Sequence, residues 1–257
     1  GTGTNNQYQS AQVMESYDIL FPLDGIIHTG DIFYPDGLSG DVETVIKEKF
    51  EAVYSHALAN EIPWYFALGN HEYEGSIDKL LQYVKTDTKL NLPSPYFLQP
   101  IDVNATNDKV NFVFTDTTPF TLGIAQIEQL AWLEQILSSH ENSTNIVIGH
   151  HPIFSNGSQG GTKILQTQYL QLLQHYRVPL YLSGHEHNLQ IIGPKETTYF
   201  IVSGAGGANL TSVDCKADSI FAEQILGGIA LYITATNIYV FPVTQNEIGN
   251  MLVINRR

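Results

Sequence analysis

The chain has 257 residues, of which 43% are hydrophobic and 15% are charged, values typical of a globular protein. It contains no run of about 18 apolar residues, so no transmembrane helix is predicted, and its single cysteine, Cys215, excludes an internal disulfide. The 26 acidic and 12 basic residues give a formal charge of −14. Such a surface disfavours nucleic acid and anionic membranes as partners, and it repels phosphorylated substrates unless cations are bound locally.

Apolar runs alternate with helical patterns over about the first 190 residues, and the pattern is of strands alone after that. This order predicts a single α/β domain over 1–257, with two packed sheets. The predicted helices cover 40–58, about 76–85, 124–140 and about 163–175. The predicted strands are GIIHTG (25–30), WYFALG (64–69), NFVFTD (111–116), NIVIG (145–149) and PLYLSG (179–184), then TYFIVSG, GIALYITAT, NIYVFPV and MLVIN.

Four of these strands end in a glycine that is followed by a residue able to bind metal. The four residues are Asp31, Asn70, His150 and His185. In open α/β sheets, ligands bind beyond the carboxyl ends of the strands, so four such ends from one sheet would bring these side chains together. A glycine before each of them permits a sharp turn and a close approach of the backbone.

Further candidates lie beside these four. Tyr34 could add a phenolate, His187 could face the same way as His185 in an extended segment, and Glu186 between them is expected to be solvated. His71 could donate a proton to a substrate, whereas His151 could equally be a histidine at the rim of a site. Each alone has an ordinary interpretation as a turn, aromatic or surface residue. Together they indicate a dinuclear site, because one tetrahedral zinc takes four ligands and six are available: Asp31, Tyr34, Asn70, His150, His185 and His187.

These motifs resemble those of the calcineurin-like metallophosphoesterase superfamily and, within it, the purple acid phosphatases of the small, tartrate-resistant type. The similarity runs from HTGDIFY to the terminal strands and includes IPWYFALGNHEY, NLPSPYF, AWLEQIL and GHEHNLQ. It implies a four-layer α/β/β/α sandwich of two mixed sheets flanked by helices, with the metal site at the carboxyl ends of the strands.

The resemblance also assigns roles to residues. It implies an Fe³⁺ ion bound by Asp31, Tyr34 and His187, with Asp31 bridging to a divalent ion, either Fe²⁺, Zn²⁺ or Mn²⁺. The divalent ion would also bind Asn70, His150 and His185. His71 would contact the phosphate and protonate the leaving group, with His151 and Gln159 as further candidates on the substrate side.

The sequence departs from the resemblance at three places. Gly1 matches the glycine of a D-x-G motif, so the ferric ligand in that motif and its strand are expected immediately upstream, outside this chain. Gln159 stands where mammalian-type members have a second substrate histidine, and it could hydrogen-bond to phosphate but not act as an acid. The segment 115–126 is shorter than its mammalian counterpart, which predicts a more open site.

The function expected from the resemblance is hydrolysis of phosphate monoesters at acidic or neutral pH, by hydroxide generated at the two metals. Small phosphorylated compounds or phosphoproteins would be the substrates. One alternative is a phosphodiesterase or nucleotide pyrophosphatase on the same metals, and another is a phosphate- or metal-binding relative that has lost catalysis. A monomer that is secreted, periplasmic or lysosomal is expected.

Overall fold

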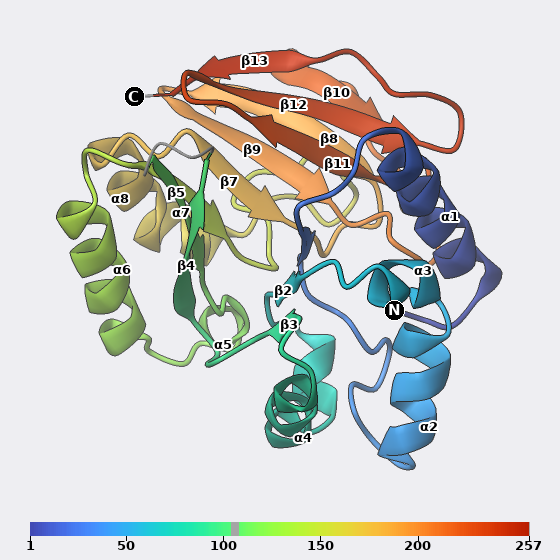
Figure 1. The fold of residues 1–257 in the computed structure, drawn as a ribbon. Coiled ribbons are helices and arrows are strands. Elements are labelled where there is room, and N and C mark those ends of the chain that lie inside the picture. The colour runs from blue at the N-terminus through green and yellow to red at the C-terminus, as the bar shows by residue number, and fades with distance from the viewer. Residues whose placement is uncertain (104–107, 257) are drawn as a thin grey trace.

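The computed structural model describes residues 1–103 and 108–256, and a mixed seven-stranded sheet lies at its centre (Figure 1). The strands follow the order β10-β8-β9-β7-β6-β5-β4, and the inner pairs β5–β6, β6–β7 and β7–β9 are parallel. The strands β6 and β7 are buried throughout, as the apolar runs IVI and LYL within them predict. The bounds are β4 Phe97–Asp102, β5 Lys109–Phe114, β6 Thr144–Ile148, β7 Leu180–Ser183, β8 Leu189–Lys195, β9 Thr198–Ser203 and β10 Ser219–Glu223.

Two smaller sheets of three strands each complete the described part of the fold. One is parallel and consists of β1 (Ile26–His28), β2 (Trp64–Phe66) and β3 (Leu90–Asn91). The other is antiparallel and consists of β11 (Gly227–Ile233), β12 (Asn237–Thr244) and β13 (Leu252–Asn255). The predicted layered α/β fold is confirmed, with one difference. Three sheets form rather than two, because no ladder joins β1 to β11 within the described residues.

The helices lie around these sheets (Figure 1). The predicted helix at 40–58 is divided into three pieces, and the one at 163–175 is interrupted at the fully buried Tyr169. The first helix was not expected, because its sequence NNQYQSAQVMESYDIL has no continuous apolar stripe. The helices are α1 Asn5–Leu20, α2 Val42–Ile46, α3 Ser55–Ala59, α4 Ile77–Tyr83, α5 Thr118–Thr121, α6 Ile127–Ser139, α7 Lys163–Gln168 and α8 Leu170–His175. A π-helical turn covers Lys47–Glu51, and 3₁₀ turns cover His71–Glu74 and Val84–Thr86.

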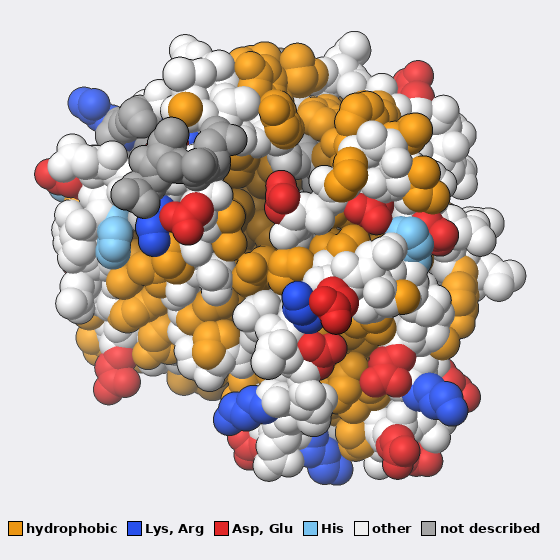
Figure 2. All heavy atoms as spheres, viewed as in Figure 1, with side chains coloured by type: hydrophobic (Ala, Val, Ile, Leu, Met, Phe, Trp, Pro, Cys, Tyr) orange, Lys and Arg blue, Asp and Glu red, His pale blue; other side chains and the backbone are white. Residues whose placement is uncertain are grey.

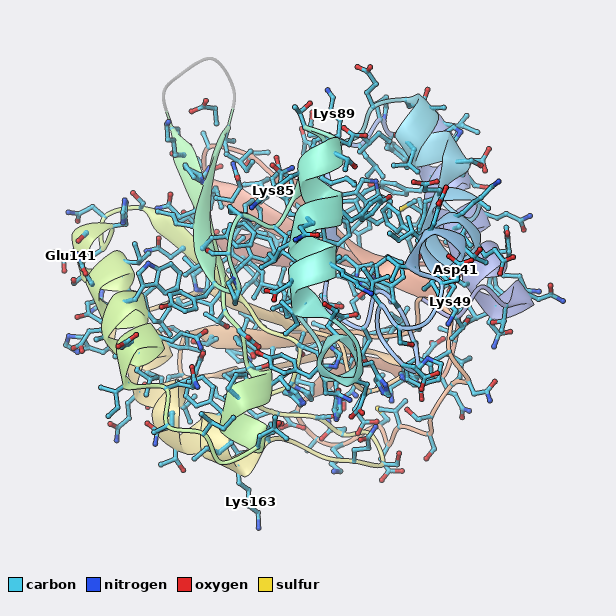
Figure 3. All side chains as sticks on the ribbon, turned by 90° about the horizontal axis from the view of Figure 1, so that it is seen from below. Asp41, Lys49, Lys85, Lys89, Glu141 and Lys163 are labelled. Atoms are coloured by element: carbon cyan, nitrogen blue, oxygen red, sulfur yellow. The ribbon has the colours of Figure 1, made fainter. Side chains whose placement is uncertain are left out.

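Two hydrophobic clusters hold the layers together. The larger includes Phe50, Trp64 and Phe114, and the smaller, to which α6 and α8 contribute, includes Leu133 and Leu173. Seen from below, α6 forms one flank of the molecule, with Glu141 just beyond its end (Figure 3). Among the described residues, no helix combines the length and the apolar character needed to span a membrane.

Candidate metal centre

Four predicted metal ligands meet where β1, β2, β6 and β7 end. Nε2 of His150 lies 3.2 Å from Oδ2 of Asp31 and 3.1 Å from Oδ1 of Asn70. Nδ1 of His185 lies 3.1 Å from the same oxygen of Asn70 and 3.2 Å from Nε2 of His150. The expectation that all four come from one sheet was wrong. Asp31 and Asn70 follow strands of the small parallel sheet, whereas His150 and His185 follow strands of the seven-stranded sheet.

The spacing of these four donor atoms fits a metal ion. Ligands at 2.0–2.1 Å from a tetrahedral ion lie about 3.3 Å from one another. Nδ1 of His150 lies 2.8 Å from the carbonyl oxygen of Thr29 and donates to it, so the lone pair on Nε2 points at the other donors. His150 is 1% exposed, so bulk water does not reach this lone pair. The lone pairs of these four donor atoms point at one another. A divalent cation between them would give each lone pair a partner.

The backbone around the centre explains the glycine pattern of the sequence. Asp31 and His185 have φ angles of 57° and 66°, a conformation that is uncommon for residues other than glycine and is often found at functional sites. A Cβ on Gly69 would lie 2.2 Å from Oδ1 of Asp31, and one on Gly30 would lie 2.5 Å from Nδ1 of His150. The strand-end loops thus touch at points where only glycine fits.

The charges around Asp31 favour the ionised form of its carboxylate. Burial opposes ionisation of Asp31, but the charge of His150, together with the hydrogen bonds from His150 and the backbone of His71, lowers its pKa well below the usual range. Burial likewise opposes protonation of His150, yet the neighbouring Asp31 raises its pKa. Each group favours the charged form of the other, so the centre can hold an anionic oxygen next to a cation.

Tyr34 and His187 lie beside this group. Their ring centroids are 5.7 Å apart. Nδ1 of His187 donates to the carbonyl oxygen of Asn209 at 2.9 Å, which leaves the lone pair of Nε2 available. Nζ of Lys49, labelled in Figure 3, donates to the carbonyl oxygen of Tyr34 at 2.7 Å and so helps to fix that loop. The structure therefore brings the rings of Tyr34 and His187, the two residues predicted to bind a ferric ion, next to each other.

His71 also lies next to Tyr34, with ring centroids 4.1 Å apart. Its backbone N–H donates to Oδ1 of Asp31 at 3.0 Å, and its Nδ1 is in close contact with the carbonyl oxygen of Pro35. The ring is thus held by Nδ1, and Nε2 stays available to a ligand.

His151 and Gln159, the two further substrate-side candidates, have different environments. The ring of His151 lies 4.5 Å from that of His185, and ligand atoms of His150, His151 and His185 all lie within 4.8 Å of one another. Burial, then the charges of His150 and His185, lower the pKa of His151 to about 2, so it is neutral. Its Nδ1 is 2.9 Å from Oγ1 of Thr117. In contrast, the side chain of Gln159 is exposed on a loop.

Sequence reasoning missed Glu72. Its buried carboxylate accepts hydrogen bonds from the backbone N–H groups of Gly69 at 2.7 Å, Asp31 at 2.8 Å and Phe33 at 3.2 Å. It therefore ties the loop after β1 to the loop after β2. The available signal was its place directly after His71 at the end of an apolar strand.

The expectation that Glu186 is solvated was wrong, because the residue is fully buried. The segment bends at His185, whose φ is 66°, and the Glu186 carboxylate turns toward the loop that contains Gln159 and Gly160. It accepts from the N–H groups of Gln159 at 2.6 Å and Gly160 at 3.0 Å, and from the hydroxyl of Thr211 at 3.2 Å. Glu186 thus holds the loop that carries Gln159.

Comparison with known proteins agrees with this geometry. Residues 7–189, which include Asp31, Asn70, His150 and His185, match the calcineurin-like phosphoesterase family. The chain is 33% identical to tartrate-resistant acid phosphatase type 5 of Mus musculus over 199 residues, which are 71% of this chain and 61% of that protein. It is 31% identical to purple acid phosphatase 7 of Arabidopsis thaliana over 219 residues, which are 77% of this chain and 62% of that protein. The chain thus spans about three fifths of the length of these relatives.

Solved structures show the same fold at lower identity. Purple acid phosphatase PPD1 from yellow lupin seeds superposes with a TM-score of 0.73 at 19% identity, over 97% of this chain and 49% of that one. GAP50, described as the anchor in the inner membrane complex of Plasmodium, superposes with a TM-score of 0.88 at 22% identity, over 100% and 86%. Since the family match covers well over half of the sequence, the chain belongs to the calcineurin-like phosphoesterase family.

Proposed function

We propose that the protein is a metal-dependent phosphatase that hydrolyses phosphate monoesters at a dinuclear centre. The convergence of four donor atoms at the ends of four strands carries the proposal: Nε2 of His150 lies 3.1–3.2 Å from the donor atoms of Asp31, Asn70 and His185, and the donor atoms of Asn70 and His185 lie 3.1 Å apart. The identity to acid phosphatases supports the same reaction.

The residues present fit two ions. Asp31, Asn70, His150 and His185 would hold the divalent ion, while Asp31, Tyr34 and His187 would hold Fe³⁺. When bound, the two metals neutralise the phosphoryl oxygens and lower the pKa of water for in-line attack. They also supply the local positive charge that an anionic substrate needs on a protein of net charge −14.

The chain's own residues orient the substrate. His71 donates through Nδ1 to the carbonyl oxygen of Pro35, so Nε2 also carries a proton only in the imidazolium form, and that form would donate to a phosphate oxygen and then protonate the leaving alkoxide. His151 is neutral, and its contact with Thr117 sets the direction of its ring. It can donate one hydrogen bond to phosphate without adding charge. Gln159 would contact the substrate less closely than the two histidines, since its side chain lies at the surface.

The substrates we propose are small phosphate esters or phosphoproteins, hydrolysed by a monomer. The resemblance to acid phosphatases supports a secreted, periplasmic or lysosomal location. Two other functions fit the same residues, namely phosphodiester or nucleotide pyrophosphate hydrolysis, and binding of phosphate or metal without turnover.

The test compares hydrolysis of an aryl phosphate and of its bis-aryl diester by metal-loaded protein. We expect faster turnover of the monoester, and a loss of at least 100-fold in His150→Ala, which removes one of the four converging donors. Faster diester turnover would favour a phosphodiesterase, and bound metal with no turnover would favour the binding protein.

The ferric ion is tested by its colour. A phenolate bound to Fe³⁺ gives a visible charge-transfer band, so Tyr34→Phe should abolish the band, whereas Tyr8→Phe on α1 should leave it unchanged. An unaltered spectrum in Tyr34→Phe would refute the role of Tyr34.

A further inference from the structure

The two histidines of IGHHP, His150 and His151, are neighbours in sequence, yet their Nδ1 atoms face different chemical groups. Nδ1 of His150 lies 2.8 Å from the carbonyl oxygen of Thr29. Nδ1 of His151 lies 2.9 Å from Oγ1 of Thr117, which belongs to a hydroxyl group. A carbonyl oxygen can only accept a hydrogen bond, whereas a hydroxyl can also donate one. The partner of Nδ1 therefore decides which nitrogen of each neutral ring carries the proton.

The hydroxyl of Thr117 already accepts one hydrogen bond, because the backbone N–H of His151 donates to its Oγ1 at 3.0 Å. Thr117 is fully buried, and Nδ1 of His151 is the one acceptor for its hydroxyl hydrogen among the described residues. A buried hydroxyl whose hydrogen finds no acceptor is destabilising. The hydroxyl therefore donates to Nδ1, so this nitrogen carries a lone pair and not a proton.

Packing holds the side chain of Thr117 in this orientation. A Cβ on Gly149 would lie 2.6 Å from the Cγ2 methyl of Thr117, so the methyl group packs closely against the backbone of Gly149. The backbone carbonyl of His151 accepts from the buried hydroxyl of Tyr181 at 2.8 Å, which fixes the other side of the same residue. If the methyl and the hydroxyl of Thr117 exchanged places, both contacts of the hydroxyl with His151 would be lost.

The two neighbouring rings thus have opposite tautomers. In His150 the proton is on Nδ1, and the lone pair of Nε2 points at the other donors of the centre. In His151 the proton is on Nε2, since Nδ1 accepts from Thr117. Ligand atoms of His150, His151 and His185 lie within 4.8 Å of one another. Despite this spacing, His151 does not complete a metal site of three histidines, because a protonated ring nitrogen has no lone pair for an ion.

The N–H of His151 is suited to an anion instead. Its ring lies 4.5 Å from that of His185, which places it beside the cation site. The protein has a net charge of −14, and Figure 2 shows basic side chains scattered over one face rather than gathered in a patch. An anion at the centre therefore gains from each N–H group that is directed at it.

We propose that Thr117 is a positioning residue that holds His151 in the tautomer with its proton on Nε2, so that His150 offers a lone pair to a cation and His151 offers an N–H to a phosphoryl oxygen. The phosphoryl oxygen as acceptor rests on the proposed function, whereas the position of the proton does not. The two histidines thus have separate tasks because their Nδ1 atoms have different partners.

The tautomer is tested by nitrogen NMR of the metal-free protein with isotope-labelled histidine. We expect His151, identified by the signals that are lost in His151→Gln, to have a protonated Nε2 and an unprotonated Nδ1. Thr117→Val should shift the Nδ1 signal, because the donated hydrogen bond is lost, and Thr117→Ser should retain the wild-type signal. Thr118→Val is the matched control and should cause no shift, since the buried hydroxyl of Thr118 has no hydrogen-bond partner among the described residues. A proton on Nδ1 of His151 in the wild type would overturn the proposal.

Binding measurements distinguish a hydrogen-bond donor from a metal ligand. His151→Gln keeps an N–H donor, and His151→Leu has none. We expect both variants to bind Zn²⁺ with unchanged affinity. Inorganic phosphate should bind to metal-loaded His151→Leu at least about 10-fold more weakly than to the wild type, with His151→Gln close to the wild type.

Weaker Zn²⁺ binding in both variants would make His151 a metal ligand and would overturn the proposal. Unchanged phosphate affinity in His151→Leu would overturn its role as a donor. Neither the NMR nor the binding measurements require turnover, so their outcome is separate from that of the phosphatase assay.

Discussion

At the scale of single residues, two buried glutamates organise the loops around the metal centre. Glu72 and Glu186 each follow a candidate histidine directly in sequence, and each carboxylate accepts hydrogen bonds from backbone N–H groups of neighbouring loops. A carboxylate that accepts several N–H groups orders the loops that supply them. These residues therefore act on the candidate ligands through the backbone.

Glu72→Gln should destabilise the fold. The substitution replaces one acceptor oxygen by an NH₂ group, which then faces a backbone donor. A buried donor left without an acceptor costs about 1–3 kcal/mol of unfolding free energy. Urea denaturation measures the change. Glu74→Gln, two residues further on and exposed, is the control and should change stability by less than about 0.5 kcal/mol. Equal effects of the two variants would contradict the role of Glu72.

Asp116 should make stability depend on pH. Burial raises its pKa to about 6 from an ordinary value of 3.8, although hydrogen bonds from Tyr73 and Thr118 oppose the rise. The folded protein therefore holds a proton that the unfolded chain releases between these two values. The stabilisation is fully present below about pH 4 and is lost as the pH rises through 6.

The measurement compares wild type with Asp116→Asn, which resembles the protonated acid. Between pH 4 and pH 7, wild type should lose up to about 3 kcal/mol of unfolding free energy relative to the variant. Asp102→Asn, at an exposed position on β4, should show no such difference. A difference in unfolding free energy between wild type and Asp116→Asn that does not change with pH would show that folding does not raise the pKa of this carboxyl.

At the scale of elements, the turns after β1 and β2 depend on glycine because two loops meet there. Gly69→Ala should displace Asp31, since the added Cβ would lie 2.2 Å from Oδ1 of that residue. We expect a loss of at least 10-fold in metal affinity, measured by titration with Zn²⁺, and a lowered Tm. Gly206→Ala is the control, because nothing lies within 4 Å of its Cβ position. Unchanged affinity in Gly69→Ala would show that the loop can shift without affecting the site.

The elements themselves were predictable where one face or both faces are apolar. The strand β6 and the helix α6 were both expected within a few residues of their observed bounds. In contrast, α1 has polar residues around much of its circumference and was missed, since its contacts with β11 and β12 arise only in the folded molecule.

At the scale of the whole molecule, the bound metals should contribute to stability. Ions that bind only the folded state stabilise it by about 2.7 kcal/mol each when present at 100 times their dissociation constant. Removal of metal with a chelator should therefore lower the Tm, and addition of Zn²⁺ should restore it. The change in Tm on removal of metal should be smaller in His150→Ala than in wild type. It should be unchanged in His175→Ala, whose side chain is exposed on α8. An identical shift in all three proteins would place the stabilising ion elsewhere.

The sequence by itself determined the alternation of strands and helices and the four glycine–ligand pairs at strand ends, because both follow from local periodicity and from the turn that glycine allows. The tertiary structure alone decided that the four candidate ligands come from two different sheets, that His151 joins the histidine cluster, and that Glu72 and Glu186 are buried. These features depend on contacts between residues distant in the chain. No local pattern encodes which loop will supply the N–H groups that a carboxylate needs.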